Sequence, residues 1–113
     1  MNKMIAFSQA DILRGLKHCL CLAKQDLLFS SYLSNPDFWK TYASARQNMY
    51  RWLRSMILKH GVNHAYLLAI QRYEDLPFFA KEVETCGKRE ALEVFFLLAL
   101  GAPPQNTPVK ISN

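Results

Sequence analysis

Apolar residues recur every three or four positions through the first half of the chain, which is the period of a helix that buries one face. Between residues 9 and 33 the repeating positions are Ile12, Leu16, Cys19, Ala23 and Leu27. Between residues 35 and 60 they are Phe38, Tyr42, Ala45, Met49, Trp52 and Met56. Two long helices with almost no residues between them must fold back on each other. The pattern therefore predicts an antiparallel helical hairpin over residues 9–33 and 35–60.

A helix-start signal precedes each of these two segments. Ser8 is followed three residues later by Asp11, and Ser34 is followed three residues later by Asp37. A serine at this position can accept a hydrogen bond from a backbone N–H of the first turn, and an acid near the start suits the positive end of the helix dipole. Pro36 falls inside the first turn of the second helix, where its missing N–H costs nothing. We therefore expect both serines to act as N-caps.

The second half of the chain divides into shorter helical segments. Gly61 is expected to end the hairpin in a left-handed conformation, and Asn63 can cap the helix that follows. Pro77 ends that helix and can open another, which Gly87 closes. The segments predicted to be helical are residues 64–74, 77–86 and 88–100.

The chain has 113 residues, half of them apolar, which is enough for one domain with its own core. We expect residues 1–101 to form this domain, an all-α fold in which three shorter helices pack with the long hairpin in a compact bundle. Residues 102–113 lack apolar periodicity and are expected to form a flexible C-terminal tail.

The last predicted helix is apolar at every position from Val94 to Leu100. A helix that is apolar on all sides must be covered on all sides. Two arrangements satisfy this condition: the helix is the central element of the bundle, or it forms a seam with another protein or a second copy of the chain. In the second arrangement Val94, Phe95 and Leu98 form the partner interface, and a homodimer is expected.

The net charge of +5 is concentrated in the hairpin. Residues 1–60 hold nine Lys and Arg against three Asp, a net charge of +6, whereas residues 61–113 hold five against six acids, a net charge of −1. The cations form a stripe on each helix: Arg14, Lys17 and Lys24 on the first, and Lys40, Arg51 and Arg54 on the second. Such a basic face can bind a phosphate backbone. The alternative is that it is only the solvated back of two amphipathic helices.

The cysteines and the length of the apolar runs bear on the expected location. Cys19, Cys21 and Cys86 form an odd set with no framework spacing, as expected for reduced thiols. No apolar run approaches the ~20 residues that span a bilayer, and the N-terminal apolar stretch is too short for the core of a signal peptide. We expect a cytoplasmic protein that does not enter a membrane.

A metal site and a cofactor site are not expected. Cys19 and Cys21 point to opposite sides of a helix, so they cannot easily bind one ion together with His18. The chain also lacks a glycine-rich phosphate loop and a nucleophile elbow.

Residues 54–60 begin with Arg54 and end with His60. Their spacing is similar to the Arg-x(4–6)-His signature of the small helical ribonucleases of the HEPN superfamily. The resemblance covers these residues only and implies a nuclease in which Arg54 binds phosphate charge and His60 transfers a proton. The alternative is that His60, directly before Gly61, only interacts with the negative end of the helix dipole.

Three functional interpretations follow from these patterns. The first is a small cytosolic interaction or regulatory module that acts through protein–protein contacts without catalysis, including contacts with a second copy. It depends on the apolar run over residues 94–100 and on the lack of a coherent catalytic set. The second is a nucleic-acid-binding regulator that uses the basic face of the hairpin. The third is a small helical ribonuclease with Arg54 and His60 as its catalytic pair.

Overall fold

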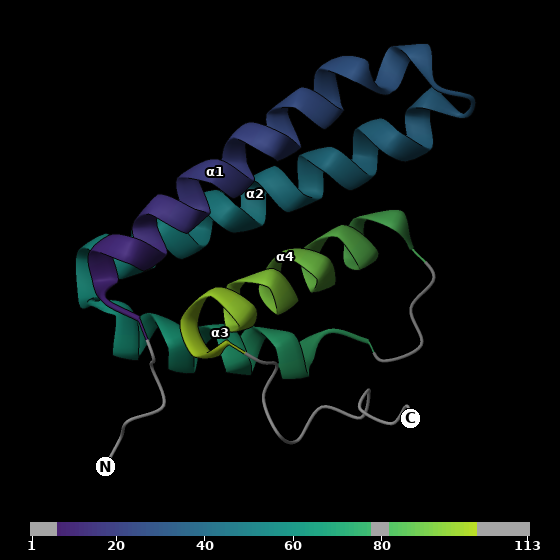
Figure 1. The fold of residues 1–113 in the computed structure, drawn as a ribbon. Coiled ribbons are helices and arrows are strands. Elements are labelled where there is room, and N and C mark those ends of the chain that lie inside the picture. The colour runs from purple at the N-terminus through teal and green to yellow at the C-terminus, as the bar shows by residue number, and fades with distance from the viewer. Residues whose placement is uncertain (1–6, 78–81, 102–113) are drawn as a thin grey trace.

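The computed structural model describes residues 7–77 and 82–101, which form a bundle of helices (Figure 1). The elements are α1 (Gln9–Phe29), the short 3-10 helix η1 (Ser30–Tyr32), α2 (Pro36–His60), α3 (Val62–Asp75) and α4 (Val83–Leu100). These two ranges contain no strand, and the predicted all-α fold class is confirmed. The tail predicted over residues 102–113 lies outside the described residues.

Helices α1 and α2 run side by side in opposite directions, joined by η1 (Figure 1). The first helix ends at Phe29 rather than at residue 33. At that point the Ser30 hydroxyl donates a hydrogen bond to the carbonyl oxygen of Leu27 at 2.7 Å, and the chain tightens into the 3-10 turn. The apolar stripes of both helices face the core, with Leu16 and Met49 among the buried residues.

Only one of the two predicted serine caps forms. The Ser8 hydroxyl oxygen accepts a hydrogen bond from the backbone N–H of Asp11 at 3.1 Å. At the start of α2 the cap residue is Asn35 instead of Ser34, and Asn35 has a left-handed backbone with φ of 66°. The prediction for Ser34 was wrong because Pro36 is itself the first helical residue, which leaves the serine one position too early.

Gly61 joins α2 to α3 without any further loop residue. Its N–H donates to the carbonyl oxygen of Ile57 at 2.8 Å, and its own carbonyl oxygen accepts from the N–H of Ala65 at 3.1 Å. The φ of Gly61 is 88°, a conformation that favours glycine and lets the chain change direction within one residue. The predicted position of the C-cap is confirmed, although its ψ of 162° lies outside the left-handed helical region. Because α3 begins at Val62, the expected cap at Asn63 was wrong.

The predicted break at Gly87 is also wrong, because α4 continues through this residue from Val83 to Leu100. Gly87 is buried where α4 crosses α2. A Cβ atom on Gly87 would lie 2.7 Å from the carbonyl oxygen of Tyr42 and 2.9 Å from the Cβ of Ala45. The glycine therefore allows close helix packing rather than ending a helix. Residues 78–81, in the middle of the predicted 77–86 helix, lie outside the described residues.

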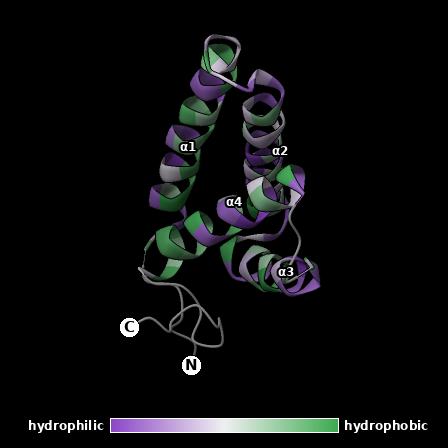
Figure 2. Cartoon of the chain, turned by 90° about the vertical axis from the view of Figure 1, so that its right-hand side faces the viewer, coloured by the Kyte–Doolittle hydropathy of each residue, from purple (hydrophilic) through white to green (hydrophobic). Residues whose placement is uncertain are grey.

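Helix α4 lies between the hairpin and α3 (Figures 1 and 2). Its residues Leu92, Phe95, Phe96 and Ala99 are fully buried. Val94 and Leu98 are half-buried against the same core. Phe95 has no exposed surface in this fold and belongs to the core, whereas a partner interface through Val94 and Leu98 stays a prediction.

Candidate functional site

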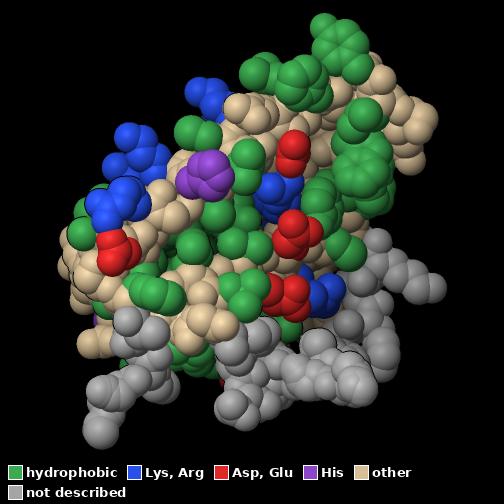
Figure 3. All heavy atoms as spheres, viewed as in Figure 1, with side chains coloured by type: hydrophobic (Ala, Val, Ile, Leu, Met, Phe, Trp, Pro, Cys, Tyr) green, Lys and Arg blue, Asp and Glu red, His purple; other side chains and the backbone are tan. Residues whose placement is uncertain are grey.

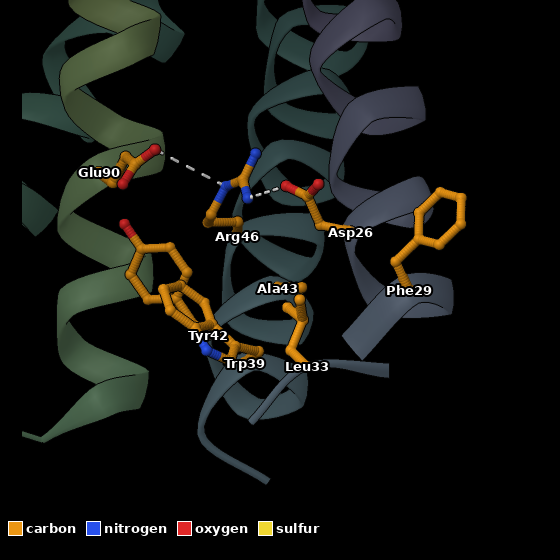
Figure 4. Close-up of a pocket in the computed structure, with 8 residues that line it drawn as sticks. All are labelled: Asp26, Phe29, Leu33, Trp39, Tyr42, Ala43, Arg46 and Glu90. Carbon is orange, nitrogen blue, oxygen red and sulfur yellow. Dashed lines mark hydrogen bonds and ion pairs between the residues drawn. The ribbon is translucent and has the colours of Figure 1, made fainter. Parts of the chain in front are cut away.

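A cavity of about 420 Å³ opens near the end of the hairpin where η1 joins α1 to α2 (Figure 4). Helix α1, the segment after η1, α2 and α4 all contribute to its walls. The lining residues are Asp26, Phe29, Leu33, Trp39, Tyr42, Ala43, Arg46 and Glu90. We call this site the hairpin-end cavity.

Arg46 reaches from α2 into the space between α1 and α4 (Figure 4). Its Nη1 donates to Asp26 Oδ2 at 2.7 Å, and its Nε lies 3.9 Å from Glu90 Oε2. The guanidinium carbon also lies 5.8 Å from the centre of the Tyr42 ring, within cation–π range. Only 12% of the Arg46 side chain is exposed, so the pairing with two carboxylates offsets the cost of burying its charge.

Three titratable groups near Arg46 have raised pKa values: Glu90, Cys19 and Tyr50. Burial, together with the nearby charges of Glu93 and Asp26, raises the pKa of the Glu90 carboxyl. Burial raises the pKa of the Cys19 thiol and raises the pKa of Tyr50 to about 12. A thiol with a raised pKa is a poor nucleophile, because the thiolate is the reactive form. The chemistry of this cluster therefore suits structure better than catalysis.

Large apolar side chains next to the cavity are exposed. We define the hairpin-end patch as Phe29, Tyr32, Leu33 and Trp39, which are 59%, 82%, 47% and 41% exposed. The Phe29 and Tyr32 rings lie 6.4 Å apart, and the other two residues line the cavity together with Phe29. Figure 3 shows hydrophobic side chains gathered at this end of the molecule. The patch is therefore continuous with the cavity, since three of its four residues also line the cavity.

All six cations of the predicted basic face are exposed: Arg14, Lys17, Lys24, Lys40, Arg51 and Arg54. They are spread along the length of the two helices. Arg14 pairs with Asp11 on its own helix, and Lys40 lies about three turns from Arg51 along α2. Arg51 and Arg54 line a separate groove with Leu20 of α1.

The two residues of the nuclease resemblance, Arg54 and His60, have different surroundings. Arg54 lines the groove beside α1, whereas the His60 ring lies 5.0 Å from the ring of His64 on α3. Six residues along an α-helix also separate the two side chains by about 120° and about 9 Å. The pairing of Arg54 with His60 in a nuclease site stays a prediction.

Sequence reasoning missed the role of Arg46. A signal was present, since Arg46 lies four residues after Tyr42 and three before Met49, within the apolar stripe of α2. A cation on a buried face needs an acidic partner. The sequence does not show that Asp26 and Glu90, which are remote along the chain, supply it.

In the described ranges, no three His, Cys, Asp or Glu side chains are placed to hold a metal ion. No helix in the described part of the chain has the length and apolar character needed to cross a membrane. Comparisons with protein-family models, curated proteins and solved structures gave no match.

Proposed function

We propose that this protein is a non-catalytic interaction module that contacts a partner protein through the hairpin-end patch. The observation that carries the proposal is the exposure of four adjacent apolar side chains beside a cavity. Exposed aromatic groups of this kind are enriched in protein interfaces, and a cavity beside them can take an anchoring side chain.

The charge of the cavity limits what the anchoring side chain can be. Arg46 is engaged by Asp26 and Glu90, and aromatic or aliphatic groups supply most of the remaining wall. An apolar side chain of the partner can enter without separating these charges. A cationic or anionic side chain would have to compete with an existing ion pair, which is costly in a partly buried site.

Site-specific photocrosslinking tests the proposal. A photoreactive phenylalanine analogue is placed at Tyr32, which is 82% exposed in the patch, or at Leu67 on α3, which is 56% exposed. We expect a discrete crosslinked adduct from position 32 and not from position 67, when the full chain is expressed in cells and irradiated. The same adducts from both positions would contradict the proposal, since contact would then be unspecific.

A substitution in the patch provides the second arm of this experiment. Trp39→Ser, with the photoreactive group kept at position 32, should abolish the adduct because an interface aromatic often contributes about 2 kcal/mol or more to binding. Leu67→Ser is the matched control, an exposed apolar residue outside the patch. Helix content measured by circular dichroism must be unchanged in both variants. An adduct that survives Trp39→Ser in a folded protein would place the contact elsewhere.

A further inference from the structure

A second groove lies on the hairpin, apart from the hairpin-end cavity. It is lined by Leu20 of α1 and by Arg51, Arg54, Ser55, Leu58 and Lys59 of α2, and it has a volume of about 560 Å³. We call it the outer groove. Among the described residues α1 and α2 alone form its walls, whereas the hairpin-end cavity also includes Glu90 of α4.

The edges of the outer groove are cationic on both helices. Arg51, Arg54 and Lys59 belong to its α2 wall, and all three are exposed. On α1, Lys17 and Lys24 lie about one turn before and after Leu20, so they project from the same side of that helix. The chain has no Asp or Glu from residue 12 to 25 or from residue 38 to 60. The groove therefore presents positive charge on both sides with no acid from either helix beside it.

Two leucines line the outer groove together with its cations, and this distinguishes between two kinds of ligand. Leu58 is 57% exposed and Leu20 is half-buried. Phosphate groups of a nucleic acid contact cations and gain nothing from exposed leucine. A ligand with an apolar ridge between two acidic edges can contact the leucines and pair with the cations at the same time. An amphipathic helix has this form, and a helix laid between two others is a common recognition mode.

We propose that the outer groove binds an acidic amphipathic helix of a partner protein. Leu20 and Leu58 contact the apolar face of that helix, while the cations on α1 and α2 pair with its flanking carboxylates. The acidic helix cannot come from the parts of this chain that the structure does not describe, because residues 1–6, 78–81 and 102–113 contain no Asp or Glu. This groove does not include any residue of the hairpin-end patch, so the two proposals stand or fall separately.

The probe is a fluorescent helical peptide of about four turns, with leucines on one face and glutamates on both flanks. A scrambled peptide of identical composition keeps the charge and removes the apolar ridge. Fluorescence anisotropy with the full chain should show binding of the first peptide and at least about tenfold weaker binding of the scrambled one, as expected when a leucine contact is lost. Equal binding of both peptides would overturn the proposal, because charge alone would then explain the affinity.

Two matched pairs of variants locate the site. Leu58→Ser should weaken binding of the helical peptide about tenfold, whereas Leu67→Ser, at a residue of nearly equal exposure on α3, should leave it unchanged. Arg54→Glu should weaken binding, whereas Lys40→Glu, which makes the same charge change on α2 outside the groove, should have little effect. Equal effects within either pair would overturn the assignment to the outer groove.

Duplex DNA serves as the competing ligand. If the basic face binds phosphates, the logarithm of the DNA affinity falls linearly with the logarithm of the salt concentration, and each phosphate contact adds about 0.9 to the slope. In that case Leu58→Ser does not alter the DNA affinity. Tighter binding of DNA than of the helical peptide at the same salt concentration, with Leu58→Ser neutral, would replace this proposal with a nucleic-acid site. Loss of peptide binding in Leu58→Ser, together with weak DNA binding, supports the acidic helix.

Discussion

Arg46 lies inside a small helical core because three different elements supply its surroundings. Asp26 on α1 and Glu90 on α4 flank its guanidinium group, and the ring of Tyr42 lies one turn away on its own helix. The two carboxylates are not equivalent. The Asp26 bond is short, whereas the Glu90 oxygen is 3.9 Å away, at the outer limit of an ion pair. At Glu90 the effects of burial and of the neighbouring carboxylates therefore outweigh the attraction to Arg46, and the pKa of Glu90 is raised.

The raised pKa of Glu90 predicts a pH-dependent effect of Glu90→Gln. A carboxyl with a higher pKa in the folded state than in the unfolded state contributes stability below its unfolded pKa, and that contribution is lost as pH rises through the folded pKa. Glutamine resembles the protonated form and does not ionise. We expect Glu90→Gln to raise the free energy of unfolding relative to the wild type more at pH 7 than at pH 4, as measured by urea unfolding. An identical effect at both pH values would show that Glu90 does not titrate abnormally.

At the scale of the helices, Gly87 and Gly15 each lie where one helix packs against another, but they differ in how well they can accommodate an added side chain. At Gly87 the nearest atoms to an added Cβ belong to the backbone and Cβ of α2 residues, which cannot move independently. At Gly15 the nearest atom is Leu98 Cδ2, the end of a flexible side chain, at 2.7 Å. The same substitution therefore meets a rigid surface at one position and an adaptable one at the other.

We expect Gly87→Ala to lower the free energy of unfolding by about 1–2 kcal/mol, since overpacking outweighs the roughly 1 kcal/mol gained in helix propensity. Gly15→Ala is the control, and its effect should stay within about 1 kcal/mol because Leu98 can change rotamer. Chemical unfolding of both variants provides the comparison. A stabilised Gly87→Ala protein would mean that α4 does not approach α2 this closely.

At the scale of the whole molecule, α2 is the element that contacts all the others. The C-terminal half of α4 is largely covered by its neighbours. Helix α4 packs against α2, α1 and α3. The Phe96 ring makes edge contacts with Tyr66 and Tyr73 of α3, at 5.8 Å and 5.4 Å between ring centres. Leu97 is the exception, with 46% of its surface exposed. The apolar run is thus covered largely within one chain, so it does not require a second copy.

This arrangement predicts opposite outcomes for two positions of α4 that lie two residues apart. Phe95→Glu places a charge in the core and should cost more than about 4 kcal/mol, which is enough to unfold most of a small domain. Leu97→Glu should remain folded with a change of about 0.5 kcal/mol or less. Circular dichroism and light scattering measure folding and mass. A wild-type dimer that Leu97→Glu converts into a folded monomer would contradict coverage within one chain.

The sequence by itself determined the helical class and several helix ends. The start of α1 at Ser8, the end of α2 at Gly61 and the end of α3 before Pro77 depend on residues within one or two turns. Apolar periodicity is also local, and it correctly predicted that most of the repeating positions of α1 and α2 lie against the core. Such signals act through neighbours in the chain, so they are visible before the chain folds.

Tertiary structure decided what local signals left ambiguous. Gly87 resembles a helix end in the sequence, but it allows α4 to cross α2 closely, and only the packing of the two helices shows this. Arg46 resembles an unpaired cation until Asp26 and Glu90 are brought beside it. The hairpin-end patch and the outer groove likewise arise where residues distant in the chain meet. Their physical cause is the burial of the apolar stripes, which sets the position of each helix and thereby decides which remaining side chains lie together at the surface.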